Sequence, residues 1–292
     1  MIAHKKERRN VTIRSRHFLS IIVFIAVLIM TLLTGPAYAI SNGQPDEDAH
    51  PYVCWVAVWD GLSPYFYVGS GSLIAEKVVL TAGHVTADMP DYTIEYVWVS
   101  FDPYAVWSPL SHPEEWKVAE SWHTHPQYEI GVNPQLKNWI SHDVGIIILE
   151  EPVPIGQYGK LPEEGLVDTL KMKTDVDQVG YGVQEMFHLP GTGPPGWGYV
   201  VDGARYYAPA QLITSNHEFS DEFMKLTANP AQGKGGTCFG DSGGPNLLGG
   251  TDIILGVTSW GTNYPCAGVS YVARVDTADV LYWINDEFGD LL

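Results

Sequence analysis

Residues 236–245 read Gly-Thr-Cys-Phe-Gly-Asp-Ser-Gly-Gly-Pro, the most specific motif in the chain. Glycines lie on both sides of Ser242, and glycine lets a backbone approach a bound molecule closely. The N–H groups of such a turn can point at an oxygen that gains negative charge during a reaction. The motif therefore indicates a nucleophilic serine, although a plain glycine-rich turn has the same composition.

Two other motifs supply the groups that a serine nucleophile needs. Residues 80–85 read Leu-Thr-Ala-Gly-His-Val and place His84 directly after an apolar strand, where a histidine can move a proton near neutral pH. Residues 141–147 read Ser-His-Asp-Val-Gly-Ile-Ile and place Asp143 at the start of the most apolar strand. Alone, the first of these motifs could be a structural histidine and the second a capping acid. Only the three motifs together indicate a catalytic serine with its histidine and acid.

The order of these residues along the chain separates two enzyme folds. Residues 240–244 also fit the G-x-S-x-G motif of α/β-hydrolases, but that fold needs its histidine after the serine. No histidine occurs beyond His217. The order His84, Asp143, Ser242 is the one found in chymotrypsin.

The rest of the chain predicts an all-β protein, because its 30 glycines and 20 prolines separate short β-like runs. Apolar residues at helical spacing after residue 277 predict a terminal helix. Residues 150–162 contain three prolines and can link two halves, and residues 190–198 predict a surface loop. The predicted strands are 52–59, 72–75, 78–81, 93–100, 144–149, 178–181, 253–259 and 269–275.

The composition excludes some classes of protein. An apolar content of 45% over 292 residues excludes a disordered chain. The 34 acidic and 16 basic residues give a net charge of -18, which argues against a nucleic-acid partner, because phosphate binding needs clustered Lys and Arg.

The N-terminus has the pattern of a secretory signal peptide. Six basic residues precede residue 17, sixteen uncharged residues follow at 18–33, and small residues stand at Ala37 and Ala39. We expect cleavage after Ala39, which makes Ile40 the first residue of a secreted protein. An uncleaved membrane anchor is the alternative, although sixteen residues fall short of the roughly 18 to 20 that span a bilayer.

The cysteines and histidines do not predict a metal or cofactor. Cys54, Cys238 and Cys266 lack the C-x-x-C spacing of zinc sites, and three cysteines cannot all pair within one chain. His123 and His125 are best explained by a strand end and the turn before Pro126.

Together the three motifs resemble the trypsin/chymotrypsin family of serine endopeptidases. The resemblance extends over residues 40–292 through Ser259-Trp-Gly, Gly180-Tyr-Gly and Ile40-Ser-Asn-Gly. It implies two six-stranded antiparallel β-barrels, at about residues 40–155 and 165–275, and a helix at about 277–288. The long interval between His84 and Asp143 also leaves room for an insertion near residues 101–139.

The resemblance assigns roles to individual residues. Ser242 would be the nucleophile, His84 the general base and acid, and Asp143 the group that orients the histidine. The oxyanion would bind to the N–H groups of Gly240 and Ser242. The new α-ammonium of Ile40 would pair with Asp241. A disulfide would join Cys238 to Cys266, leaving Cys54 unpaired.

The resemblance also indicates specificity. The family's cysteine after the histidine is Val85 here, and its partner near residues 69–71 is missing as well. The floor of the substrate pocket is Gly236 and not an acid, so we expect cleavage after apolar or aromatic residues rather than after Lys or Arg. The implied pocket residues are Gly236, Thr237, Ser259, Trp260, Gly261 and Gly268.

The expected partners are a protein or peptide substrate and a protein inhibitor. Two alternatives keep the fold and change the function. One is a catalytically silent secreted protein that only binds other proteins. The other is an esterase, which uses the same nucleophile, base and oxyanion donors on a different acyl group.

Overall fold

The computed structural model describes residues 40, 43–105, 108–131, 140–189, 197–214, 220–229, 234–261 and 266–292. The predicted signal peptide, 1–39, and most of the predicted loop at 190–198 lie outside this part of the chain. No helix in the described part is long and apolar enough to cross a membrane.

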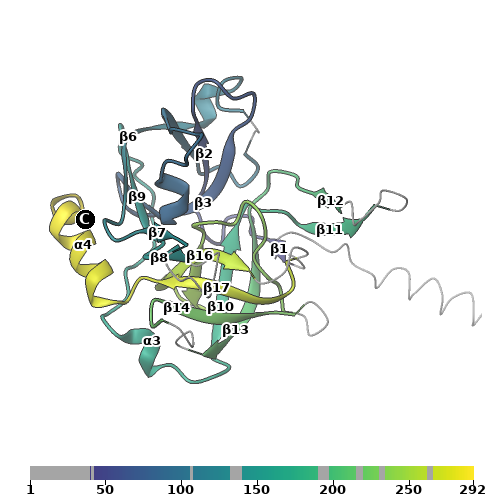
Figure 1. Cartoon of the computed structure of the whole chain (residues 1–292), viewed down its shortest axis with the longest axis vertical. Coiled ribbons are helices and arrows are strands. Elements are labelled where there is room, and N and C mark those ends of the chain that lie inside the picture. Colours follow the sequence, from purple (N-terminus) through teal and green to yellow (C-terminus); the bar gives the residue numbers. More distant parts are fainter. Residues whose placement is uncertain are drawn as a thin grey trace, which may run out of the picture. The chain divides into compact units, whose positions relative to one another are not determined.

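Six antiparallel strands in the N-terminal half form a closed barrel, in the order β2-β3-β4-β9-β6-β5 (Figure 1). The most apolar strand, β9, is buried along its whole length because it pairs with β4 on one side and β6 on the other. The strands are β2 Val53–Trp59, β3 Tyr67–Ala75, β4 Val78–Thr81, β5 Tyr96–Ser100, β6 Lys117–Thr124 and β9 Gly145–Leu149.

The C-terminal half forms a second closed barrel. Its sheet runs β1-β13-β10-β15-β16-β17-β14, and a further pairing of β13 with β14 closes it. The two barrels confirm the architecture that the resemblance implies. The strands are β1 Gln44–Pro45, β10 Asp175–Gly180, β13 Tyr206–Thr214, β14 Phe223–Ala228, β15 Pro245–Leu248, β16 Ile254–Gly261 and β17 Gly268–Arg274.

Shorter elements complete the described structure. Two hairpins pair β7 with β8 and β11 with β12. Their bounds, with those of the one-turn helices, are β7 Glu129–Ile130, β8 Ile140–Ser141, β11 Glu185–His188, β12 Trp197–Val200, α2 Gly83–Thr86, α3 Leu166–Thr169, η1 Pro113–Glu115 and η3 Gly289–Leu291.

One sequence expectation was wrong in part. The stretch 101–139 is not simply an insertion, because it contains β6, which lies between β5 and β9 in the barrel. Only the segments before and after β6 are additions to the barrel.

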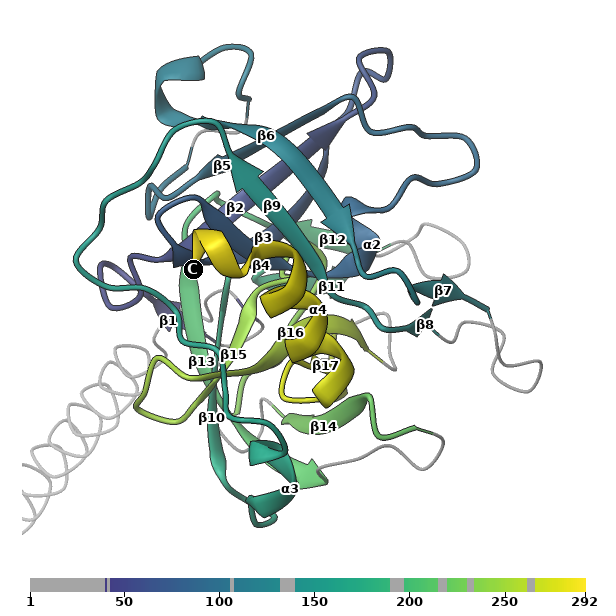
Figure 2. The ribbon, with the colours of Figure 1, turned by 90° about the vertical axis from the view of Figure 1, so that its left-hand side faces the viewer.

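The two ends of the described chain each join the opposite barrel. The N-terminal strand β1 pairs with β13 of the second barrel. Asp46, the residue after β1, forms a buried ion pair with Arg205, in which Oδ2 lies 2.7 Å from Nε. The predicted terminal helix is α4, Ala278–Phe288, which follows the second barrel. Figure 2 shows the ribbon of α4 in front of the two barrels. Its Trp283 and Phe288 rings contact His125 and His123, at the end of β6 in the first barrel.

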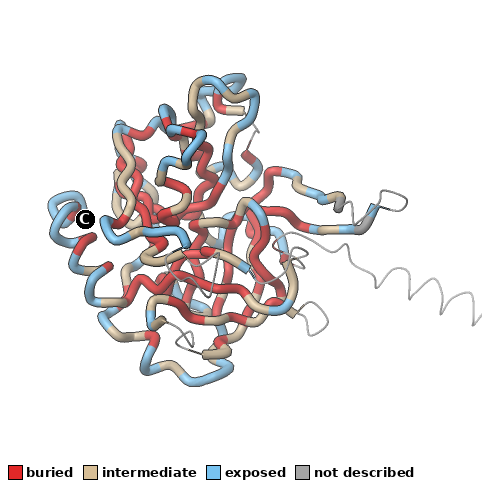
Figure 3. The backbone as a smooth tube through the Cα atoms, viewed as in Figure 1, coloured by how far each residue is buried: buried red, intermediate tan, exposed pale blue. Residues whose placement is uncertain are grey.

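The main hydrophobic core is continuous from one barrel to the other. Figure 3 shows the buried residues along the strands of both barrels. At their boundary Trp55 of β2 stacks on Tyr181, which follows β10, with ring centroids 5.5 Å apart. Such a ring pair contributes about 0.5–1.5 kcal/mol beyond the burial of its area. The site described below lies along this boundary.

Candidate active site

His84 lies in the one-turn helix α2, which directly follows β4. Gly83 precedes His84, and a Cβ at that position would lie 2.8 Å from the Tyr128 ring and 3.1 Å from the Val144 nitrogen. Only glycine therefore lets this turn pack against the start of β9. The packing holds the His84 backbone next to Asp143.

Asp143 is fully buried and accepts hydrogen bonds from three sides. The His84 backbone N–H donates to Oδ1 at 2.7 Å, and His84 Nδ1 lies 2.9 Å from Oδ2. The Ser259 hydroxyl of β16 donates to Oδ2 as well. The second barrel thus supplies one donor to a carboxylate of the first.

The electrostatics of this pair follow from its burial and its contacts. Burial alone would lower the pKa of His84, but the charge of Asp143 and its hydrogen bond outweigh burial and raise that pKa. Burial would raise the pKa of Asp143, but His84 and the Ser259 hydroxyl outweigh it and lower that pKa. The carboxylate therefore stays ionised and keeps a proton on Nδ1 of the ring.

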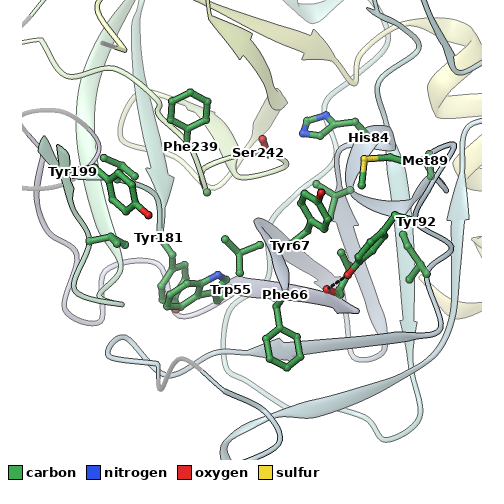
Figure 4. Close-up of a pocket in the computed structure, with 18 of the residues that line it drawn as sticks. Trp55, Phe66, Tyr67, His84, Met89, Tyr92, Tyr181, Tyr199, Phe239 and Ser242 are labelled. Carbon is green, nitrogen blue, oxygen red and sulfur yellow. Dashed lines mark hydrogen bonds between the residues drawn. The ribbon is translucent and has the colours of Figure 1, made fainter. Parts of the chain in front are cut away.

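Ser242 lies in a turn of the second barrel that presses against the first. Its carbonyl accepts a hydrogen bond from the Ser70 nitrogen of β3 at 2.7 Å. A Cβ on the next residue, Gly243, would lie 2.0 Å from the Thr81 hydroxyl of β4, so only glycine fits there. Ser242 and His84 line the same cavity (Figure 4). No hydrogen bond joins their side chains in the described structure, and this contact is often loose before substrate binds.

The predicted oxyanion donors face away from the protein's own acceptors. The Phe239 carbonyl accepts a hydrogen bond from the Val183 nitrogen at 2.8 Å. Because the peptide unit is planar and trans, the Gly240 N–H points in the opposite direction. Gly240 adopts a φ of +97°, which glycine tolerates. Within the described residues, neither the Gly240 nor the Ser242 N–H has a backbone or side-chain acceptor.

Asp241 is a fully buried acid whose partners are backbone donors. Its carboxylate accepts hydrogen bonds from the nitrogens of Gly182 and Cys238 at 2.7 and 2.8 Å. A Cβ on Gly180 or Gly182 would lie within about 2.5 Å of that carboxylate, which explains the Gly-Tyr-Gly motif. Burial raises the pKa of Asp241 to about 7, and no cation contacts it in the described part of the chain. Ile40 is also fully buried.

The predicted substrate-pocket residues lie on neighbouring segments. Gly261 of β16 pairs with Ser270 of β17, and the Thr237 hydroxyl donates to the Ser270 hydroxyl at 3.1 Å. Gly236 lies against Ala228, because a Cβ on Gly236 would be 2.5 Å from the Ala228 Cβ. Trp260 stacks on Tyr271, and Gly268 begins β17. Residues 262–265 lie outside the described structure.

The cysteines behave as the resemblance implies. Cys238 and Cys266 form a disulfide, with Cα atoms 5.2 Å apart, and Cys54 is a buried free thiol. At the site of the missing family disulfide, a Cβ on Gly69 would lie 3.0 Å from the Val85 side chain. Gly69 and Val85 thus face each other where the bridge would be.

A large apolar cavity adjoins Ser242 and was not predicted from the sequence. Its volume is about 570 Å³, and it contains none of the predicted pocket residues (Figure 4). Its walls come from separate strands and loops of both barrels, so no local motif could have indicated it. The lining residues are Trp55, Val58, Phe66, Tyr67, Val68, His84, Val85, Ala87, Met89, Tyr92, Ile94, Tyr181, Val183, Met186, Tyr199, Val201, Phe239, Gly240 and Ser242.

One group of potential metal ligands occurs in the described structure. Side-chain atoms of His112, Glu114 and Glu115 lie within 4.8 Å of one another at η1. None of the three lines the cavity beside Ser242. Exposed acidic groups of this kind are common without an ion, so they do not indicate a metal centre.

Comparisons with known proteins agree with the family and the fold. The family model described as Trypsin matches residues 40–284. A solved structure titled HL collagenase aligns with a TM-score of 0.62 and 20% identity, over 85% of this chain and 98% of that one. Human heparin binding protein aligns with a TM-score of 0.56 and 15% identity, over 85% of this chain and 96% of that one. At these identities the solved structures support the fold alone. The family model matches most of the chain and shows that it belongs to the trypsin family of serine proteases.

Proposed function

We propose that this protein is a secreted serine endopeptidase that cleaves peptide bonds through an acyl-enzyme. The observation that supports this best is the hydrogen-bonded arrangement of His84, the buried Asp143 and Ser259 beside Ser242. A stable fold does not need an ionised carboxylate that is fully buried under a histidine at the edge of a cavity.

The chemistry follows from the contacts of each group. The Ser242 oxygen attacks the carbonyl carbon while His84 Nε2 takes the hydroxyl proton. The ionised Asp143 keeps the other proton on Nδ1 and stabilises the imidazolium that forms. The oxygen of the tetrahedral intermediate accepts hydrogen bonds from the Gly240 and Ser242 N–H groups.

Three further proton transfers complete the cycle. When the intermediate collapses, the carbon–nitrogen bond breaks and His84 gives its proton to the leaving amine. Water then attacks the acyl-enzyme, and His84 takes a proton from the water and returns one to the Ser242 oxygen. The enzyme is restored with no net gain or loss of protons.

Specificity at the residue before the cut follows from the predicted pocket. Gly236, Thr237 and Gly268 contribute no carboxylate, and burying a Lys or Arg charge without one is costly. We therefore expect Phe, Tyr, Leu or Met at this position. Peptide anilides that differ only there test it, and fastest turnover of the Arg or Lys member would overturn it.

Activation would follow directly from export. Signal-peptide cleavage after Ala39 would leave the α-ammonium of Ile40 free, with no separate propeptide. No cation contacts the buried Asp241 among the residues that the structure describes, and a buried carboxylate gains greatly from one. The N-terminal sequence of the active, secreted protein is expected to be Ile-Ser-Asn-Gly.

The decisive experiment is the substitution Ser242→Ala. It should abolish peptide hydrolysis and labelling by a fluorophosphonate while leaving the circular dichroism spectrum unchanged, since only one oxygen is lost. Labelling of the wild-type protein separates an enzyme from a silent binding protein. Hydrolysis of esters but of no peptide in a broad library would identify the esterase alternative.

A further inference from the structure

The 570 Å³ cavity beside Ser242 has no role in the mechanism above. Stacked rings of Trp55 and Tyr181 form part of its wall, and Tyr67 and Tyr92 form another part. The hairpin of β11 and β12 contributes Met186 from the second barrel. Figure 4 shows Met89 and Tyr92 near His84, and Tyr181 and Tyr199 on the opposite side of Trp55.

The position of the cavity decides which part of a substrate can enter it. Under the proposed function the acyl part of the substrate lies along Ser259–Gly261 and in the pocket at Gly236 and Gly268. The cavity shares none of these residues, yet it includes His84, which protonates the leaving nitrogen. It therefore opens on the leaving-group side of the cleaved bond.

The chemistry of the walls selects an apolar occupant. None of the described residues that line the cavity is Asp, Glu, Lys or Arg. The hydroxyls of Tyr92 and Tyr181 already donate to the carbonyls of Val58 and Asp102, at 3.0 and 2.8 Å. A charged side chain would lose its hydration there without gaining a partner.

The aromatic walls also suit a ring. Tyr67 meets Tyr92 edge to face, with ring centroids 4.6 Å apart, and Tyr67 remains half exposed. An apolar cavity of about 150 Å³ is known to hold benzene, so a volume several times larger has room for a bulky side chain.

We propose that this cavity binds large apolar side chains, aromatic ones above all, on the leaving-group side of the substrate. Cleavage is then fastest where such a residue directly follows the cut. This selectivity rests on the proposed function, because it needs an acyl-enzyme and a leaving amine. It is separate from the selectivity for the residue before the cut, since the two sets of lining residues do not overlap.

The test uses the acyl-enzyme itself. N-acetyl ethyl esters of Phe, Leu and Arg are supplied, and the fastest is used to form the acyl-enzyme. Amino acid amides are then added as competing nucleophiles. The amine nitrogen attacks the ester carbon, a carbon–nitrogen bond forms, and the bond to the Ser242 oxygen breaks. The proton leaves the amine through His84 and ends on the Ser242 oxygen, so this step reverses acylation and reports the leaving-group site alone.

Chromatography of the peptide and acid products gives the partition ratio for each amide. We expect Phe and Leu amides to capture the acyl group at least ten-fold better than Gly amide, and Arg and Asp amides to show no such gain. Equal partition of Phe and Gly amides would overturn the proposal. Failure of every ester to acylate the protein would overturn this proposal together with the proposed function.

A matched pair of variants assigns the effect to the cavity. Met89→Glu places a charge on its wall, whereas Met172→Glu makes the same change on an exposed residue outside it. Met89→Glu should reduce capture by Phe amide at least ten-fold and increase capture by Arg amide, and Met172→Glu should change neither. Because the ratio compares two fates of one intermediate, it does not depend on how much protein is folded. Unaltered ratios in Met89→Glu would contradict the assignment.

Discussion

The two barrels each contribute a buried aspartate to the proposed site, and the two aspartates differ in their partners. In the first barrel, the His84 backbone N–H and ring already donate hydrogen bonds to Asp143, and the charge of that carboxylate raises the pKa of His84. In the second, Asp241 is equally buried, its donors among the described residues are backbone N–H groups, and its pKa is raised to about 7. The His84–Asp143 pair is assembled by packing and by hydrogen bonds, one of them from Ser259 of the second barrel. For Asp241, in contrast, we propose that cleavage before Ile40 supplies the missing cation. Four predictions test this difference.

The largest effect is expected where the first barrel is broken. Asp143→Asn keeps the shape of the side chain but removes the charge that fixes the His84 tautomer. We expect kcat to fall about 10⁴-fold, as in the Ser-His-Asp template. Steady-state kinetics measure it, and Asp286→Asn, at an exposed position of α4, is the matched control. A loss below ten-fold would contradict the role of Asp143.

A smaller loss is expected where the second barrel is left incomplete. Protein that retains Ala39 before Ile40 cannot place its ammonium at the Ile40 nitrogen, so the Gly240 N–H should not be held in place. The loss of one oxyanion donor costs about 10² to 10³ in rate. One alanine added after Leu292 is the control. The His84 pKa, measured by NMR, should be the same in both extended proteins, and full activity of the protein starting at Ala39 would refute this activation.

The pH dependence of the free energy of unfolding should differ between protein that retains Ala39 and protein that starts at Ile40. Without the ammonium, folded Asp241 holds its proton up to about pH 7, whereas the unfolded chain releases it near the ordinary pKa of 3.8. The folded state then binds more protons between these values, so its free energy of unfolding should fall as pH rises from about 4 to 7. Urea denaturation at several pH values measures the slope. In protein that starts at Ile40 the slope should be smaller, and Asp241→Asn should remove it.

The smallest effect concerns the thiols. Cys54 is buried in β2, and burial raises its pKa, so a thiol reagent should not modify the folded protein. Denaturation without reductant should release one reactive thiol, and peptide mapping should find Cys238 joined to Cys266. Three free thiols, or a bridge to Cys54, would contradict the pairing. With the expected pairing, Cys54 of the first barrel is a free thiol, whereas the second barrel has a disulfide.

The sequence predicted the fold and the polar residues of the site through short motifs. It located β4 to the residue, but it began β3 at Ser72, whereas the strand begins at Tyr67 and includes the glycines at 69 and 71. A Cβ on Gly69 would crowd Val85 and the Ser242 carbonyl, and one on Gly71 would crowd Val79. Tertiary packing, not local preference, explains these glycines.

Other elements could not be predicted for similar reasons. Strand β13 contains Pro209, which pairs with Asp177 of β10. On its other side β1 pairs only up to Tyr207 and β14 only from Leu212, so the missing N–H of Pro209 has no strand opposite it. The cavity beside Ser242 was missed because its walls meet only after both barrels have closed.

The exchange of chain ends between the barrels bears on how this protein can be divided. Because β1 pairs with β13 of the second barrel and α4 contacts the first, a cut in the connection at 150–162 would leave each fragment carrying a piece that packs on the other. Neither fragment is then an autonomous unit, and the two are expected to fold by complementation when mixed. Since the main core is also shared by the two barrels, we expect the chain from Ile40 onward to unfold as one cooperative unit.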